Sequence, residues 1–314
     1  MTVSAEIICD SLSNEGVRLT TMKLRYPRFI HAEVMTHRAF SRNAASSRAI
    51  PIHKMIDEVI MNPALPERFG LNGTGMQDHG AMSDYGARLT CARLMEARDY
   101  AVAVAKQMLL QEEVPHKQIV NRILEPFMHI TTLITATEWK NFFALRNHPA
   151  ADPTFQALAA KMEQAYVEST PMVREAGDWH LPFITVEDVD TAVNMAMEDI
   201  VRLTTGVLPT FVMGEDSFEY MITQLVVKQS VARCARVSYN NFDGKRSKLE
   251  DDVALYGKLT EAYPIHASPL EHCATPDARG PDGKWQNKYQ HGNFIGWCQH
   301  RKMIVGENLP TNKE

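Results

Sequence analysis

The sequence predicts an α+β protein with a mixed sheet and several long helices. Residues 83–114 are rich in Ala, Leu, Met, Arg and Glu and contain neither Gly nor Pro between Gly86 and position 114. This composition predicts a long helix. Residues 128–138, MHITTLITATE, are rich in β-branched side chains and predict a strand. Helical stretches outnumber strands and do not alternate with them regularly, which favours the α+β class.

The remaining elements are predicted from local composition and from the Gly, Pro and capping residues that end or begin an element. Residues 17–25 predict a strand that ends in a turn at Pro27, and either a second strand or the start of a helix follows. Residues 62–80 are dense in Pro, Gly and Asn and predict a long loop, which is often functional. Asp152 is a predicted N-cap followed by Pro. Further helices are expected over residues 116–124, 137–146, 152–169, 186–203 and 222–238, and loops over 176–183 and 277–292.

The chain of 314 residues is long enough for one large or two ordinary domains. A change in composition at residues 205–220 predicts a boundary between a first part, 1–205, and a second part, 221–314. The first part would carry the polar motif described below, and the second would carry the segments ARVSY and SPLEH.

Composition excludes several classes of protein. A hydrophobic content of 45% and a charged content of 23% are typical of soluble globular proteins. The net charge of −5 and a pI near 6.2 argue against a nucleic-acid-binding surface. Five scattered cysteines without a CxxC pair predict neither a disulfide framework nor structural zinc. No signal peptide and no apolar run of roughly 18 residues is visible, so we expect a cytoplasmic protein without a membrane partner.

Residues 36–48, THRAFSRNAASSR, form the most polar motif of the chain. Arg, Ser and Asn side chains donate charge-assisted hydrogen bonds to phosphate oxygens, so the run suits an anionic ligand. If the segment is helical, His37, Ser41 and Arg48 share a face. The alternative is a solvated polar face without a ligand, and local composition leaves both open.

Three further segments carry candidate residues. Arg122 in NRILEPF and Arg146 in NFFALR each follow apolar residues, where an arginine either serves a site or only extends its head group to water. In ASPLEH, Ser268 and Glu271 match a helix N-cap and a capping box. That interpretation leaves His272 unexplained.

The C-terminal segment GWCQHRK, residues 296–302, faintly repeats the His-Arg pair of the polar motif. His291 and His300 lack the spacing of metal ligands, so no metal site is expected. The common fingerprints GxGxxG, GxxxxGK[ST], HExxH and GxSxG are absent from the sequence. A redox or transfer enzyme built from this chain would use a different motif.

The polar motif resembles the signature of the flavin-dependent thymidylate synthases, RHRxxSxNExSxRY. Four other segments resemble that family in kind, and together they touch most of the chain. In the family ARVSY and SPxEH precede the signature, whereas here they follow it, so the chain resembles a circular permutation or a duplication with divergence. The matching residues and segments are His37, Arg38, Ser41, Asn43, Ser46 and Arg48, with NRIL at 121–124, NFFALR at 141–146, ARVSY at 235–239 and SPLEH at 268–272.

The resemblance implies a fold like that of the thymidylate synthase complementing proteins and a specific reaction. Such enzymes use FAD to convert dUMP to dTMP, with methylenetetrahydrofolate as the carbon donor and NADPH as the reductant of the flavin. Their partners are therefore a nucleotide and a folate rather than nucleic acid or membrane. They are usually homotetramers with active sites between subunits.

The resemblance also implies roles for individual residues. Arg146 would be catalytic, polarising the uracil ring, and it would also bind the substrate. The other substrate-binding residues would be Glu33, Ala45, Ser46, Ser47, Arg48 and Arg122. The residues lining FAD would be His37, Arg38, Ala39, Asn141, His272 and, from the C-terminal segment, Arg301.

The chain departs from the signature at three positions, where Thr36, Ala44 and Ala49 replace Arg, Glu and Tyr. One hypothesis is that Arg301 or Lys302 restores the lost charge. Glu33 stands where the family usually has Gln, which suits an amino group on the base better than a carbonyl.

Three functions therefore stay open. The first is a thymidylate synthase of variant architecture. The second is an enzyme that alkylates or hydroxymethylates another pyrimidine nucleotide. The third is a nucleotide-binding relative without catalysis.

Overall fold

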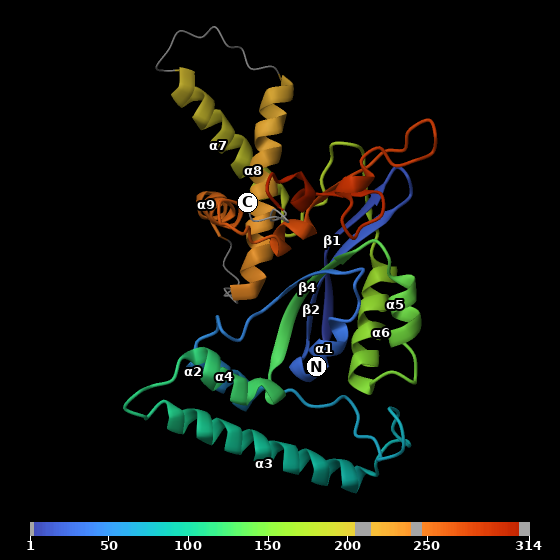
Figure 1. The fold of residues 1–314 in the computed structure, drawn as a ribbon, viewed down its shortest axis with the longest axis vertical. Coiled ribbons are helices and arrows are strands. Elements are labelled where there is room, and N and C mark those ends of the chain that lie inside the picture. Colours follow the sequence, from blue (N-terminus) through green and yellow to red (C-terminus); the bar gives the residue numbers. More distant parts are fainter. Residues whose placement is uncertain (1–2, 205–214, 240–246, 308–314) are drawn as a thin grey trace, which may run out of the picture.

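The computed structural model describes residues 3–204, 215–239 and 247–307, and its centre is a five-stranded mixed sheet (Figure 1). All neighbouring strands are antiparallel except β1 and β5, so the predicted α+β class with a mixed sheet is confirmed. The strands in spatial order are β3 (Ser41–Ala44), β4 (His129–Ala136), β2 (Arg18–Pro27), β1 (Ser4–Ser13) and β5 (Met172–Arg174).

Strand β1 was not predicted from the sequence. A bulge between Ile7 and Cys9 interrupts its alternation, and its second half carries the polar residues Asp10, Ser11 and Ser13. Antiparallel pairing with β2 along its whole length holds it in the sheet. Non-local pairing thus outweighs a weak local pattern.

An apolar core fills one face of the sheet. Helix α1 (His31–Val34), helix α5 (Lys140–Arg146) and helix α6 (Pro153–Glu168) cover this face (Figure 1). The predicted N-cap of α6 is confirmed, because Asp152 accepts hydrogen bonds from the amides of Thr154 and Phe155. After β2 the chain turns helical at residue 28, which decides between the two alternatives left open above.

The C-terminal elements cover the other face of the sheet through small apolar clusters around Leu19 and Leu133 and through buried hydrogen bonds. Three helices lie here, α7 (Val186–Thr204), α8 (Glu215–Arg236) and α9 (Leu249–Thr260). Short elements follow, and they frame the pockets described below. These are η3 (Val237–Tyr239), η4 (Ser268–His272), β6 (Ala274–Pro276), η5 (Lys288–Gln290), β7 (Trp297–Gln299) and η6 (His300–Met303).

A separate helical layer packs at the end of the sheet (Figure 1). It contains α2 (Ile52–Met61), α3 (Asp84–Met108) and α4 (Lys117–Leu124) around their own apolar cluster. The long helix was predicted to reach residue 114 but ends at Met108. Leu110 beyond it is 84% exposed, so no packing stabilises further turns there.

The predicted domain boundary at residues 205–220 falls largely on residues 205–214, which lie outside the described residues. The described helices include none that is both long enough and apolar enough to cross a membrane.

Candidate functional site

The polar motif is not a helix. It leaves α1 through a turn in which the Thr36 amide and hydroxyl both donate to the Glu33 carbonyl, then enters strand β3. The alternation of β3 sends Arg42 and Asn43 to opposite faces of the sheet. Because both of its donors bind the Glu33 carbonyl, Thr36 ends helix α1, at the position where the signature motif has an arginine.

Glu33, His37 and Arg146, whose roles the resemblance implies, lie together on the apolar face. Nε of Arg146 donates to Nε2 of His37 at 3.0 Å, and its guanidinium lies 3.7 Å from Glu33 and over the Phe155 ring. Burial, followed by the charges of Arg146 and Arg42, lowers the pKa of His37 to about 4. The imidazole is thus neutral at physiological pH and free to accept this hydrogen bond.

Glu33 has a raised pKa. Partial burial is the largest cause, the Asp152 carboxylate adds to it, and Arg146 opposes it. The carboxylate and His37 together orient Arg146 while leaving most of its N–H donors unused. Such an arginine can polarise a carbonyl group.

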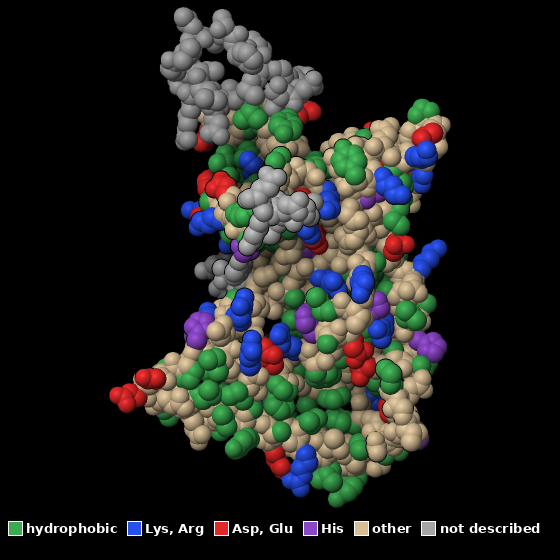
Figure 2. Space-filling view, in the orientation of Figure 1, with side chains coloured by type: hydrophobic (Ala, Val, Ile, Leu, Met, Phe, Trp, Pro, Cys, Tyr) green, Lys and Arg blue, Asp and Glu red, His purple; other side chains and the backbone are tan. Residues whose placement is uncertain are grey.

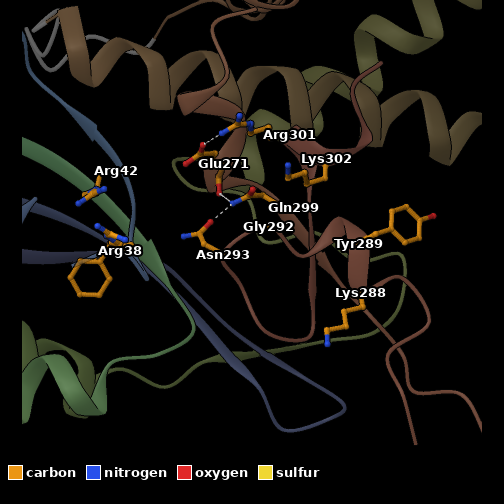
Figure 3. A pocket seen from close by; sticks show the side chains of 11 residues that line it. Arg38, Arg42, Glu271, Lys288, Tyr289, Gly292, Asn293, Gln299, Arg301 and Lys302 are labelled. Carbon is orange, nitrogen blue, oxygen red and sulfur yellow. Dashed lines mark hydrogen bonds and ion pairs between the residues drawn. The ribbon is translucent and has the colours of Figure 1, made fainter. Parts of the chain in front are cut away.

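A pocket of about 540 Å³ lies between the motif and the C-terminal elements (Figure 3). We call it the basic pocket, because five of its lining side chains are cationic and one is acidic. Arg38 and Arg42 stand on one side and the C-terminal residues on the other. Its lining is Arg38, Phe40, Arg42, Glu271, Lys288, Tyr289, Gly292, Asn293, Gln299, Arg301 and Lys302.

The cations of this pocket differ in how far they are neutralised. Arg301 pairs with Glu271 and with Glu307, and Lys302 pairs with Glu307 at 2.6 Å. Neither Arg38 nor Lys288 has an acidic partner among residues 3–204, 215–239 and 247–307. In Figure 2, Lys, Arg and His side chains gather across the middle of the visible face, between the layer of α2–α4 and the C-terminal elements. The surplus of positive charge suits a phosphate-bearing ligand.

An amide network joins the two sides of the basic pocket. Asn293 accepts from the Ser41 hydroxyl and from Gln299, and it donates to the Ala39 carbonyl. Gly292 has φ +61°, and a Cβ there would meet Oε1 of Gln299 at 2.4 Å. A glycine is therefore required for Gln299 to reach across.

ARVSY and SPLEH pack on the opposite face, against the strand of the motif. Asn43 donates to the Cys234 carbonyl and accepts from the Ser238 hydroxyl, and the Ser46 amide donates to the Ser238 carbonyl. These contacts place residues about 190 positions apart in direct hydrogen bonding.

His272 ends a buried chain of hydrogen bonds. Its Nδ1 contacts the Thr135 hydroxyl at 2.7 Å, and the chain continues through Thr21 to His180 and Ser11. Burial lowers the pKa of His272 to about 3. Its Nε2 has no hydrogen-bond partner among the residues that the structure describes.

The capping-box interpretation of SPLEH is wrong. The segment is a 3-10 helix of five residues without a side-chain cap, and its N-cap is Ala267. Glu271 turns to Arg301 instead of back to the Ser268 amide. An ion pair with a distant residue thus outweighs the local cap.

The predicted phosphate segment lies farther along the motif. Ala45 is buried, and its amide donates to the Thr131 carbonyl. The Ser47 hydroxyl donates to Glu125, whereas Arg48 and Arg122 are exposed side chains.

Of the predicted site residues, only Arg38 and Arg301 line the basic pocket. Asn141 is exposed on α5. Sequence reasoning did not assign Lys288, Asn293 and Gln299, although the last lies within GWCQHRK, the segment that repeats His-Arg.

Asp277, His291 and Cys298 form a buried cluster whose ligand-type atoms lie within 4.8 Å of one another. Nε2 of His291 contacts Asp277 at 2.8 Å, while its Nδ1 accepts from the Gly296 amide. The ring proton therefore sits on Nε2, where a metal would have to bind. We interpret the hydrogen bond between Asp277 and His291 as a structural contact that holds the loop of residues 277–298 in place.

The chain was compared with protein families, with curated proteins and with solved structures. No family model and no curated protein matches the chain. The chain is similar to two crystal structures of the UMP/dUMP methylase PolB from Streptomyces cacaoi, bound with 5-Br UMP and with 5-Br dUMP. Sequence identity is 17% and 16%, TM-scores are 0.43 and 0.45, and each match covers 53% of this chain and 89% or 90% of that chain. Likenesses of this degree support no inference about fold or activity.

Proposed function

We propose that this protein is a flavin-dependent enzyme that methylates dUMP to dTMP, with methylenetetrahydrofolate and NADPH as co-substrates. One observation carries the proposal. ARVSY, which resembles part of the family's first segment, contacts the strand of the HRxxSxNxxSxR motif through Ser238, and SPLEH packs beside that strand and lines the basic pocket through Glu271. These contacts support a single site despite the altered segment order.

The basic pocket would hold the FAD diphosphate. Five cations face one lining carboxylate, and Arg38 and Lys288 keep their charge without an acidic partner among the described residues. Arg301 and Lys302 enter this pocket from the C-terminal segment, but Glu271 and Glu307 neutralise them, so their position gives no support to the hypothesis that they replace the charge lost at Thr36. When bound and reduced by NADPH, the flavin would supply the hydride for the new methyl group.

Arg146 would polarise the uracil ring of dUMP. The neutral imidazole of His37 accepts from one of its N–H groups without cancelling its charge, and Phe155 supports the guanidinium. Arg48 and Arg122 would hold the nucleotide phosphate. Both side chains are exposed, so their charge is available to a ligand.

We also propose a cytoplasmic homo-oligomer, as the resemblance implies. The first half of α3 supports an assembly, because none of its side chains is buried in the monomer. Tyr85 and Leu89 there are 72% and 47% exposed. A second copy of the chain would cover such apolar side chains.

A second candidate is the modification of a different pyrimidine nucleotide, such as dCMP. Glu33 favours it, because its carboxylate lies 3.7 Å from Arg146. An acidic neighbour weakens the pull of Arg146 on a carbonyl and accepts a hydrogen bond from an amino group.

The test is to load the purified protein with FAD and to titrate it with dUMP and with dCMP. We expect flavin absorbance bands, tighter binding of dUMP, and tritium release from C5-labelled dUMP that needs methylenetetrahydrofolate and NADPH. Arg146→Ala should abolish release, whereas Lys161→Ala at an exposed position of α6 should not. A protein that cannot take up FAD contradicts both candidates, and release only from dCMP favours the second.

A further inference from the structure

A second pocket of about 480 Å³ lies outside the proposed site. It is framed by one face of α8, the loop before His180 and the C-terminal short elements. We call it the amide pocket, because three of its side chains are primary amides. Its lining is Gly177, Trp179, Glu219, Tyr220, Thr223, Gln224, Thr275, Pro276, Asn287, Gln290, Cys298 and Met303.

The amide pocket and the basic pocket share one wall. In η5, Lys288 lines the basic pocket, whereas Gln290 lines the amide pocket. In β7, Gln299 and Cys298 divide in the same way, because successive side chains of a strand point to opposite sides. The two pockets are therefore back to back, and a ligand in one does not reach the other directly.

The chemistry of the two linings is opposite. The described residues that line the amide pocket include no Lys or Arg, so nothing there compensates for a phosphate. Its apolar lining residues include Trp179 and Met303, which suit the flat face of an aromatic ring, and Tyr220, Pro276 and Cys298 lie beside them.

Polar groups stand around this apolar surface. Among the described residues, Gln224 and Thr223 have no side-chain hydrogen-bond partner within the protein. The Asn287 side chain donates through Nδ2 to Asp277, and its Oδ1 accepts no hydrogen bond from a described residue. These side chains offer both donors and acceptors. Side-chain amides are the groups that proteins use to bind the edges of heterocyclic bases.

We propose that the amide pocket binds an uncharged planar heteroaromatic ring of nucleobase size. Trp179 and Met303 would contact the face of the ring, and the side-chain amides of Gln224 and Gln290 would bind its edge. A volume of 480 Å³ lies within the range of small-molecule sites. The proposal does not depend on FAD or dUMP binding at the basic pocket.

The experiment uses adenosine, cytidine and thymidine as probes, together with inorganic pyrophosphate for the basic pocket. Binding to the full chain is measured by calorimetry and by saturation-transfer NMR. Gln290→Ala and Lys288→Ala form a matched pair, because both change η5 but on different sides of the wall. We expect Gln290→Ala to weaken binding of at least one nucleoside about 3- to 10-fold and to leave pyrophosphate binding unchanged.

Lys288→Ala should give the reverse pattern, weakening pyrophosphate binding alone. Thr223→Val is a second variant on α8, chosen in case Gln290→Ala disturbs the loop, and circular dichroism checks the fold of each. Three results would overturn the proposal: no measurable nucleoside binding, displacement of the nucleoside by pyrophosphate, or a loss of nucleoside binding in Lys288→Ala but not in Gln290→Ala or Thr223→Val.

Discussion

The two faces of the central sheet are built in different ways. On one face, Leu24, Ile134 and other apolar side chains pack against α5 and α6. On the other face, Thr21, Thr135 and His272 form a buried hydrogen-bonded chain with the C-terminal elements. The same strands thus carry one continuous apolar core on one side and, on the other, this polar chain between two small apolar clusters around Leu19 and Leu133.

The difference teaches how each face obtains its specificity. Apolar packing needs only the right volume, whereas a buried hydroxyl or imidazole needs a partner at a defined distance and angle. The polar face therefore fixes the position of SPLEH and ARVSY relative to the motif. That position frames the basic pocket.

The largest expected effect is on the apolar face. Leu158→Ala removes a fully buried side chain from the core between α6 and the sheet. We expect a loss of about 2–5 kcal/mol in the free energy of unfolding, measured by urea denaturation. A loss below about 1 kcal/mol would show that this face is loosely packed.

The second prediction compares the two faces on one strand. Thr135→Val leaves Nδ1 of His272 without a partner, whereas Thr21 keeps its hydrogen bond to His180, so the expected loss is about 1–3 kcal/mol. Thr132→Val is the control on the other face, where the Tyr26 hydroxyl keeps its bond to His31. Equal losses in the two variants, measured by urea denaturation, would contradict the distinction.

The third prediction concerns pH. Burial lowers the pKa of both His180 and His272 from 6.5 to about 3. Between pH 3 and pH 6.5 the two histidines are protonated in the unfolded chain but not in the folded protein. The free energy of unfolding therefore falls as the pH drops below about 6.5. The slope should be about 1.4 kcal/mol per pH unit for each histidine.

His272→Gln should remove one such contribution from the pH dependence of the urea midpoint, measured from pH 7 to pH 4. Above pH 6.5 the slopes of variant and parent should agree. An unchanged slope below pH 6.5 would show that His272 is protonated in the folded state.

The smallest effect on stability is expected at Glu33. Its ion pair with Arg146 is long and partly exposed, so Glu33→Gln should change the free energy of unfolding by less than about 1 kcal/mol. The change should instead shift nucleotide preference toward dUMP over dCMP, measured as a ratio of dissociation constants. Glu138→Gln, at another exposed carboxylate, is the control, and a shift of the same size there would remove Glu33 from the site.

Many helices and strands could be predicted from the sequence because short stretches of neighbouring residues determine them. The Asp152–Pro153 cap predicted the start of α6, and the β-branched run of residues 128–138 predicted β4. Two failures share a physical cause. Strand β1 depends on pairing with β2, and the capping box of SPLEH gives way to the ion pair of Glu271 with Arg301.

The sequence by itself determined the main helices, strands β2 and β4, and a polar motif suited to a nucleotide or flavin phosphate. Only the tertiary structure decided that this motif is a turn and a strand rather than a helix. It also decided which distant residues meet it: Asn43 meets ARVSY, and Arg38 shares a pocket with Lys288 and Arg301. The physical reason is that local propensity acts over a few residues, whereas buried polar partners and pocket charges come from segments that meet only when the chain packs.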